Sequence, residues 1–307
     1  MTKVIEADTS FKVWWHLTRP HTLTASFVPV FLGTAIAAAI AEHDINIMLF
    51  FAMLIASMLI QAATNMFNEY YDYKLGLDNE NSVGIGGTIV RHGVAPKTIL
   101  LIALSFYAIA MLLGIYICAS SSWWLVAVGL VCMVIGYLYT GGPYPIAYSP
   151  YGEFVSGAVM GMGIVLISFF IQTGTVSLDA VFISVPSMIL VGAIMLSNNI
   201  RDIVGDKDGG RKTMAILVGR HNAITVLATF FIVSYVWIIV LIIFNDLSPW
   251  ALLIFLSIKK PIAAIQLFRT KEAPLEVMPA MKSTAQTNTF FGFLLGVGIL
   301  IQHFFFA

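Results

Sequence analysis

The sequence predicts an all-α integral membrane protein, a bundle of nine transmembrane helices around a central cavity. Of its 307 residues, 59% are hydrophobic and only 10% are charged, whereas a soluble domain carries roughly 25% charged residues. The apolar residues also gather in runs of about 20, the length that an α-helix needs to cross the hydrocarbon of a bilayer. We therefore expect a single polytopic membrane domain over residues 1–307.

Nine apolar runs meet this length, and the connections between them alternate in character. The runs lie at residues 23–41, 46–67, 98–118, 122–140, 153–172, 180–198, 223–244, 248–268 and 287–306. The connections after the first, third, fifth and seventh runs are short and contain no Lys or Arg. The connections after the even-numbered runs are longer, and three of these four are charged.

The basic residues predict the orientation, because Lys and Arg collect on cytoplasmic loops. Of the 16 basic residues, 14 lie before the first run or after an even-numbered run. The other two, Lys259 and Lys260, lie inside the eighth run. The N-terminus and the longer loops should therefore face the cytoplasm from the inner or plasma membrane of a cell. The formal net charge of zero gives no argument for a nucleic-acid partner.

Two acidic patches at the ends of apolar runs share one spacing. The first runs from Asn68 through Asp72 to Asp78, and the second from Asn198 through Asp202 to Asp208. Chance is one explanation, since Asn and Asp are favoured in turns. Recurrence at matching ends of the second and sixth runs instead predicts a pseudo-repeat of two four-helix units. Such a repeat would bring the patches together across the cavity.

Carboxylates that converge at a membrane surface repel one another unless a cation lies between them. Oxygen ligands without His or Cys favour a hard ion such as Mg²⁺, which usually completes its coordination with substrate phosphates. Side chains three or four residues apart share one helix face, so each helix would offer several oxygens. A solvated, charge-paired loop is the alternative. The metal ligands that we expect are Asn68, Asp72, Asp78, Asp202 and Asp206.

Other polar residues near the patches are candidates for binding the substrate. Asn65 lies within an apolar run, where an amide is costly unless it is used. Arg201, Arg211 and Lys212 follow the second patch and would neutralise a departing diphosphate. For Arg211 and Lys212 taken alone, binding of lipid headgroups is the favoured alternative.

Three further residues are candidates on weaker grounds. Arg91 ends a glycine-rich segment that has neither the P-loop nor the dinucleotide spacing, and we expect it to contact an anion. Lys260 interrupts the eighth run beside Pro261, so that it should face a cavity or extend outward to the membrane surface. Tyr139 could face a cationic intermediate, with membership of an interfacial aromatic belt as the alternative.

At these residues the chain resembles the UbiA superfamily of intramembrane aromatic prenyltransferases. The resemblance spans the chain, and its signatures are Arg19–Leu23, Asn65–Asp78, Gly84–Arg91 and Asn198–Thr213. It implies nine helices and two Asp-rich motifs that bind a polyprenyl diphosphate through Mg²⁺. The wider family places the last Asp of the first motif eight residues after the Asn. Here the separation is ten, which is typical of the branch that prenylates 1,4-dihydroxy-2-naphthoate.

The resemblance implies transfer of a polyprenyl group from its diphosphate to this aromatic acid, with loss of diphosphate and CO₂, giving demethylmenaquinone for menaquinone biosynthesis. Asp72, Asp202 and Tyr139 would be catalytic, and Arg91 or Lys260 would bind the acceptor carboxylate. One alternative is another aromatic acceptor, such as 4-hydroxybenzoate. The other is a cation-coupled transporter, although transporters bind ions at the bilayer midplane rather than at helix ends. Besides the substrates we expect membrane lipid as a partner, no redox cofactor and no obligate protein partner.

Overall fold

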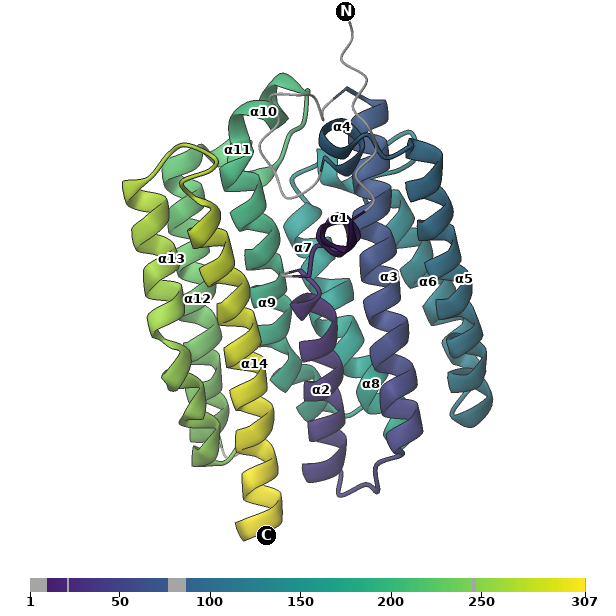
Figure 1. Ribbon diagram of the computed structural model, residues 1–307. Coiled ribbons are helices and arrows are strands. Elements are labelled where there is room, and N and C mark those ends of the chain that lie inside the picture. Colours follow the sequence, from purple (N-terminus) through teal and green to yellow (C-terminus); the bar gives the residue numbers. More distant parts are fainter. Residues whose placement is uncertain (1–9, 21, 77–86, 245–246, 307) are drawn as a thin grey trace, which may run out of the picture.

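The computed structural model describes residues 10–20, 22–76, 87–244 and 247–306, and every regular element within these ranges is helical. Long helices run side by side between two ends of the molecule, and α14 (Met278–Phe306) finishes at the lower end in Figure 1. The predicted all-α membrane class is confirmed.

Seven helices in the described ranges are long and apolar enough to cross a membrane. They are α3 (Ile47–Lys74), α5 (Pro96–Ser120), the continuous segment Gly152–Thr173, α9 (Leu178–Arg201), α12 (Arg220–Ile243), the segment Pro249–Thr270, and α14. Two shorter apolar helices, α2 (Thr24–Ala39) and α6 (Trp124–Leu138), coincide with the first and fourth predicted runs. Each predicted run is therefore helical, but the total of nine crossings is not confirmed.

Two of the long segments change helix type along their length. Gly152–Thr173 consists of α7 (Gly152–Ser156), a π-helical turn η2 (Gly157–Gly163) and α8 (Ile164–Thr173). Pro249–Thr270 consists of a 3₁₀-helix η3 (Pro249–Ser257) and α13 (Lys259–Thr270). Pro261 has no N–H to bond the carbonyl of Ser257, and its ring crowds that carbonyl. The change of helix type between η3 and α13 falls at this position.

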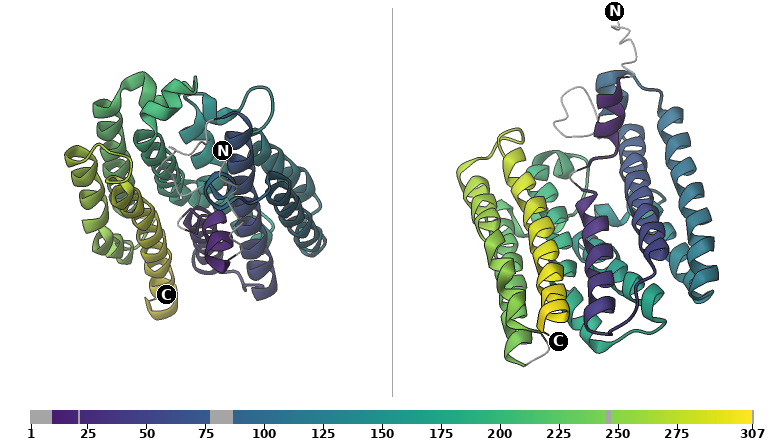
Figure 2. Two further views of the ribbon diagram at one scale, coloured as in Figure 1. Left: turned by 45° about the horizontal axis from the view of Figure 1, so that its top comes forward. Right: turned by 60° about the horizontal axis from the view of Figure 1, so that its bottom comes forward.

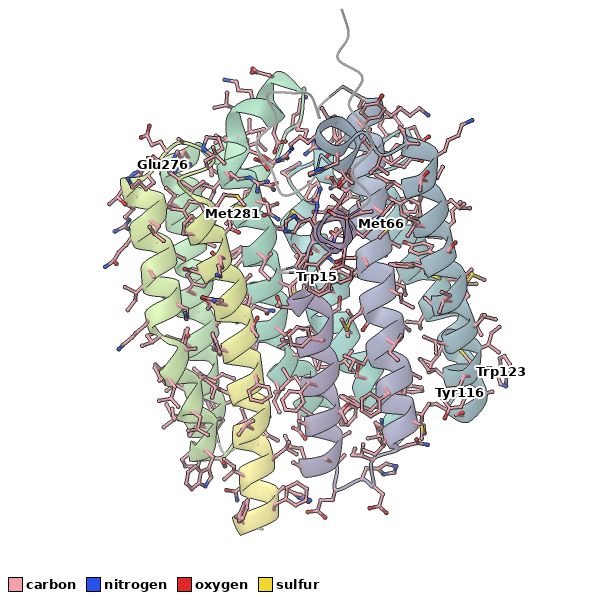
Figure 3. The ribbon with its side chains drawn as sticks, viewed as in Figure 1. Trp15, Met66, Tyr116, Trp123, Glu276 and Met281 are labelled. Atoms are coloured by element: carbon pink, nitrogen blue, oxygen red, sulfur yellow. The ribbon has the colours of Figure 1, made fainter. Side chains whose placement is uncertain are left out.

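Short helices gather toward the end of the bundle at which α3 and α9 finish (Figure 1). They are α1 (Phe11–Leu17), α4 (Thr88–His92), α10 (Ile203–Asp208) and α11 (Met214–Val218). Aromatic side chains mark the opposite end of α5 and α6, where Tyr116 and Trp123 are exposed (Figure 3). Exposed Tyr and Trp at this level suit the boundary between lipid and water.

The first and last apolar helices close the bundle. α2 packs against α14, and both views of Figure 2 show these purple and yellow helices side by side. The larger core joins α2, α8, α9 and the helices from α12 to α14, with Phe169, Phe231 and Phe291 buried in it. A smaller core joins α1, α3, α4 and α5 around Met66 and Phe67. α9 is the most deeply buried of the seven long segments.

Glycines allow the π-helical turn η2 to approach α9 closely. A Cβ at Gly157 would lie 2.3 Å from the carbonyl oxygen of Met188, and one at Gly161 would lie 2.5 Å from that of Ser187. On α9 itself, a Cβ at Gly192 would lie 3.0 Å from the carbonyl oxygen of Glu153. This approach holds α7 against the last turns of α9.

Replacing Gly161 should therefore push these segments apart. We expect Gly161→Ala to lower the free energy of unfolding by roughly 1–3 kcal/mol, as overpacking of a close-packed interior does. Thermal unfolding of the purified protein in detergent measures this. Gly114→Ala is the control, because a Cβ at Gly114 meets nothing within 4 Å. Equal stability of the two variants would contradict the role of Gly161.

Candidate active site

A cavity of about 1470 Å³ lies inside the bundle. Side chains of α3, α5, α6, the α7–α8 segment, α9 and α10 line it. The lining from α5 and α6 is mainly apolar, with Met111, Ile115 and Val128 among its members. Polar residues enter from the ends of α3 and α9, which carry the two predicted acidic patches. An apolar chamber with a charged end suits an amphiphilic ligand with an anionic head.

Arg211 joins the two acidic patches. Its guanidinium donates to Asp72 Oδ1 at 2.5 Å and to Asp206 Oδ1 at 2.9 Å, and these three side chains are 8–17% exposed. It also lies over the ring of Tyr148 in the 3₁₀-helix η1 (Ile146–Tyr148), 4.9 Å from the centroid. The patches therefore converge as predicted. The cation between these two carboxylates is a guanidinium, although we predicted that Arg211 would contact the substrate.

The electrostatics of this bridge depend on its burial. Burial raises the pKa of Asp206 to about 6, although the charge of Arg211 opposes this shift. Burial also lowers the pKa of Arg211, but Asp72 and Asp206 outweigh it and raise that pKa above its usual value. The guanidinium therefore stays charged. Asp206 Oδ2 is buried and has no hydrogen-bond partner within the described ranges, so one carboxylate oxygen remains available.

Asp202 pairs with its own neighbour in the chain. Arg201 donates Nε to Asp202 Oδ1 at 2.6 Å and Nη2 to Asp202 Oδ2 at 2.5 Å. The remaining Arg201 nitrogen contacts the sulfur atoms of Met278 and Met281 on α14, at 3.5 and 3.3 Å. Met281 is labelled on that helix in Figure 3. Arg201 thus lines the cavity, as expected of a substrate-binding residue, but its donors are occupied by Asp202 and α14.

The predicted metal ligands are only partly assembled. Asn68, Asp72, Asp202 and Asp206 line one cavity, whereas Asp78 lies outside the described residues. Across the described ranges, no three His, Cys, Asp or Glu side chains lie together as a metal site. The donor set of carboxylate and amide oxygens, with Asp206 Oδ2 unpartnered, fits a hard divalent ion. The oxygens that accept from Arg201 or Arg211 would become metal ligands only in competition with these guanidinium groups, whereas Asp206 Oδ2 is free of them.

Two other predicted residues line the cavity, and each already makes hydrogen bonds to other parts of the protein. Asn65 donates Nδ2 to the carbonyl of Thr18 and to Thr22 Oγ1, both at 3.0 Å. Its amide nitrogen therefore fastens the segment between α1 and α2. Tyr139 is buried, and its hydroxyl donates to the carbonyl of Gly152 at 3.4 Å.

Three predicted substrate-binding residues do not line the cavity. Arg91 is exposed on α4 and folds back over Gly87, where an added Cβ would lie 2.7 Å from its Nε. Lys212 is exposed, and its backbone N–H donates to the carbonyl of Tyr148 at 2.9 Å. The Lys260 ammonium lies 5.6 Å from the ring centroid of Phe290 on α14. The rotation of α13 and the path of the loops, which spacing does not specify, direct these side chains elsewhere.

Arg19 lines the cavity although we did not predict it as a site residue. Its Nε is buried and has no hydrogen-bond partner within the described ranges. Its φ of +50° lies in the left-handed region, where non-glycine residues are strained and often functional. The sequence could have indicated this residue, because an arginine that directly precedes a proline lies just before the first apolar run.

Arg220 also lines the cavity but supports the fold. It donates to the carbonyls of Ile200 at 3.1 Å, Phe268 at 3.1 Å and Lys271 at 2.6 Å. These carbonyls belong to the C-terminal ends of α9 and α13, where helices leave carbonyls unpaired and attract cations. Arg220 therefore fixes the end of α9 that carries Asp202.

Comparison with known proteins finds relatives over nearly the whole chain. The sequence profile of the UbiA prenyltransferase family matches residues 26–283. The 1,4-dihydroxy-2-naphthoate octaprenyltransferase of Bacillus subtilis (strain 168) is 60% identical over 293 residues, which cover 95% of this chain and 94% of that protein.

Solved structures share the fold. The apo structure of a UbiA homolog from Aeropyrum pernix K1 aligns with a TM-score of 0.68 at 16% identity, covering 92% of this chain and 98% of that one. A UbiA homolog from Archaeoglobus fulgidus bound to DMAPP and Mg²⁺ aligns with a TM-score of 0.62 at 15% identity, covering 92% and 99%. At these identities the likeness concerns the fold alone.

The bridge at Arg211 generates a stability prediction. Arg211→Gln leaves two mostly buried carboxylates without their shared cation, which should cost about 3–5 kcal/mol of unfolding free energy. Denaturation of the purified protein in the presence of EDTA measures this. Lys212→Gln is the control, since Lys212 is the exposed neighbour. Indistinguishable stability of the two variants would show that the bridge does not support the fold.

Proposed function

Because the chain belongs to the UbiA prenyltransferase family, we propose that it transfers a polyprenyl group from polyprenyl diphosphate to 1,4-dihydroxy-2-naphthoate. Diphosphate and CO₂ are released, and the product is the quinol form of demethylmenaquinone, a precursor in menaquinone biosynthesis. The observation that carries this proposal is the 60% identity, over 95% of the chain, to the Bacillus subtilis octaprenyltransferase. The cavity lined by both aspartate patches supports it.

We also propose that the reaction depends on Mg²⁺, held by Asn68, Asp72, Asp78, Asp202 and Asp206. Carboxylate and amide oxygens are its preferred ligands, and the Archaeoglobus fulgidus homolog is described as bound to DMAPP and Mg²⁺. When bound, the ion would neutralise charge on the diphosphate oxygens. The residues themselves orient the diphosphate at the polar end of the cavity, with the prenyl tail along the apolar lining.

In the first chemical step the bond between the allylic carbon and its diphosphate oxygen breaks, and the electron pair leaves with the diphosphate. Charge then develops on the leaving oxygens, where nearby cations stabilise it most effectively. Arg19 and Arg211 line this end of the cavity, and Arg19 has an unpartnered Nε. The Tyr139 ring faces the same cavity and stabilises the allylic cation through its π-electrons.

In the second step the naphthoate ring carbon that bears the carboxylate attacks the allylic carbon. A carbon–carbon bond forms at that position, the bond to the carboxyl carbon breaks, and CO₂ leaves. The electron pair of the broken bond restores the aromatic ring, which gives the quinol form of the product. Because CO₂ departs in place of a ring proton, no base is needed at this carbon, and the enzyme is neither oxidised nor reduced.

We propose that the end of the bundle with the short helices faces the cytoplasm, in the plasma membrane of the cell. The Lys and Arg residues of the longer loops support this orientation through the positive-inside rule. Both substrates would then meet at a cavity whose polar end opens toward the cytoplasm. The apolar lining continues into the membrane-spanning part of the bundle.

The reaction is tested by assaying the purified protein with one prenyl diphosphate and a panel of aromatic acids. We expect 1,4-dihydroxy-2-naphthoate to be the preferred acceptor, with one CO₂ released for each prenylated product. Chelation of divalent ions should stop turnover, and Mg²⁺ should restore it. Preference for 4-hydroxybenzoate, or a product that retains its carboxylate, would assign the chain to another reaction of the family.

Replacement of the site aspartates tests the residue assignment. Asp72→Asn and Asp202→Asn should each reduce turnover by at least about 10²-fold, since each removes a charge that holds the diphosphate complex. Insertion and folding should persist, because Asn preserves the shape of each side chain. Asp179→Asn, at the opposite end of α9, is the control and should keep full activity. Full activity in both site variants would rule out the assignment.

A further inference from the structure

Glu153 is a buried acid that the proposed reaction does not use. It is 2% exposed, and its Oε1 accepts a hydrogen bond from Asn199 Nδ2 at 2.8 Å. Its other oxygen, Oε2, is buried and has no partner within the described ranges. Glu153 itself does not line the cavity, whereas Asn199 does. A buried carboxyl with so few partners is costly, and the side-chain hydrogen bond that it makes within the described ranges is with a residue of the cavity wall.

The packing of α7 on α9 fixes this contact. Gly157 and Gly161 allow the segment that follows Glu153 to approach the α9 backbone, and Gly192 leaves room for the Glu153 carbonyl. Glu153 lies in the first turn of α7, so this close approach places its carboxyl beside the last turns of α9. The contact joins residues 46 positions apart, and it is therefore a product of the tertiary fold.

Asn199 shares its helix face with the second acidic patch. Asn199, Asp202 and Asp206 are spaced by three and four residues, which places them on one side of a helix. Backbone hydrogen bonds from Asp202 N to Asn198 O and from Asp206 N to Asp202 O continue the helical path from α9 into α10. All three side chains line the cavity.

The amide of Asn199 has two different ends, and Glu153 determines which end is free. A carboxylate accepts hydrogen bonds and does not donate them, so it selects the amide nitrogen of Asn199. Asn199 Oδ1 is then left to the cavity. Without Glu153 the amide could rotate and present N–H groups, which repel a cation and do not coordinate it.

We propose that Glu153 is a positioning residue that holds Asn199 with its oxygen toward the cavity, where it adds a neutral ligand to the divalent metal–diphosphate complex beside Asp202 and Asp206. This inference rests on the proposed function. It differs from the assignment of the aspartates, because Glu153 acts through Asn199 and touches neither substrate. Residues that orient metal ligands in this way typically contribute 10- to 100-fold in affinity.

The test measures binding of farnesyl S-thiolodiphosphate, which is not turned over, to the purified protein with and without Mg²⁺. Glu153→Leu removes the acceptor and should weaken Mg²⁺-dependent binding about tenfold. KM for the prenyl diphosphate should rise in parallel, while KM for the naphthoate stays unchanged. Glu153→Gln keeps an acceptor oxygen for Asn199 and should bind within about twofold of the wild type. Unchanged affinity in Glu153→Leu would overturn the proposal.

A double-mutant comparison separates positioning from general support of the fold. If Glu153 acts only through Asn199, Glu153→Leu combined with Asn199→Ala should bind no more weakly than Asn199→Ala alone. Additive losses would overturn the proposal. So would a Glu153→Leu variant that unfolds at a lower temperature but binds the thiolodiphosphate normally.

An isosteric exchange covers the case in which Glu153→Leu does not fold. Asn199→Asp places two carboxyl groups together and should weaken binding of the thiolodiphosphate. The double variant that also carries Glu153→Gln restores a hydrogen bond between the two positions, now donated by the amide at position 153. We expect the exchanged pair to regain at least about tenfold in affinity over Asn199→Asp, and no recovery would reject the pairing. If the wild type shows no Mg²⁺-dependent binding, the proposed function itself fails. If the wild type binds and the variants match it, only the role of Glu153 fails.

Discussion

A carboxylate buried in an apolar bundle requires a compensating group, and this requirement organises the polar end of the molecule. Asp72 and Asp206 share the guanidinium of Arg211, and Asp202 receives that of Arg201. Glu69, fully buried on α3, instead accepts the backbone N–H of Ile89 in the first turn of α4 at 3.1 Å. Asp72 and Glu69 therefore connect α3 to other elements, whereas the pair of Arg201 and Asp202 lies at the junction of α9 and α10. The charged groups that suit diphosphate chemistry also hold the ends of α3, α4, α9 and α10 in place.

The sequence was sufficient for the features that depend on one helix at a time. Hydropathy located the apolar helices, since about 20 apolar residues in succession have few other stable environments. The repeated Asn and Asp spacing predicted that Asp72 and Asp206 would face a common cavity, and both line it. Asn65 lines the cavity too, with its nitrogen bonded to the segment between α1 and α2, and its role in binding the substrate stays a prediction.

Features that depend on helix rotation or on loop paths could not be predicted from the sequence. Lys260 seemed suited to a cavity, but the orientation of α13 directs it toward Phe290 on α14. Arg211 follows a glycine turn, with Gly210 at a φ of +77°, and nothing in its spacing indicated that this turn would place it between two carboxylates. Glu153 went unnoticed because it is the first residue of the fifth apolar run, and an acidic residue is ordinary in the first turn of a helix. Its partner Asn199 is supplied only by tertiary packing.

The bridge formed by Arg211 has a thermodynamic consequence for ligand binding. A divalent ion that takes Asp72 Oδ1 and Asp206 Oδ1 as ligands competes with the Arg211 guanidinium for these oxygens, so its net affinity is reduced by the cost of weakening that bridge. A diphosphate that arrives with the ion offers Arg211 a new partner, because guanidinium groups pair well with phosphate oxygens. The two ligands then assist each other, and linkage requires that each raise the affinity of the other by the same factor. Such positive cooperativity would keep the polar end metal-poor at rest, with the ion admitted together with the molecule on which it acts.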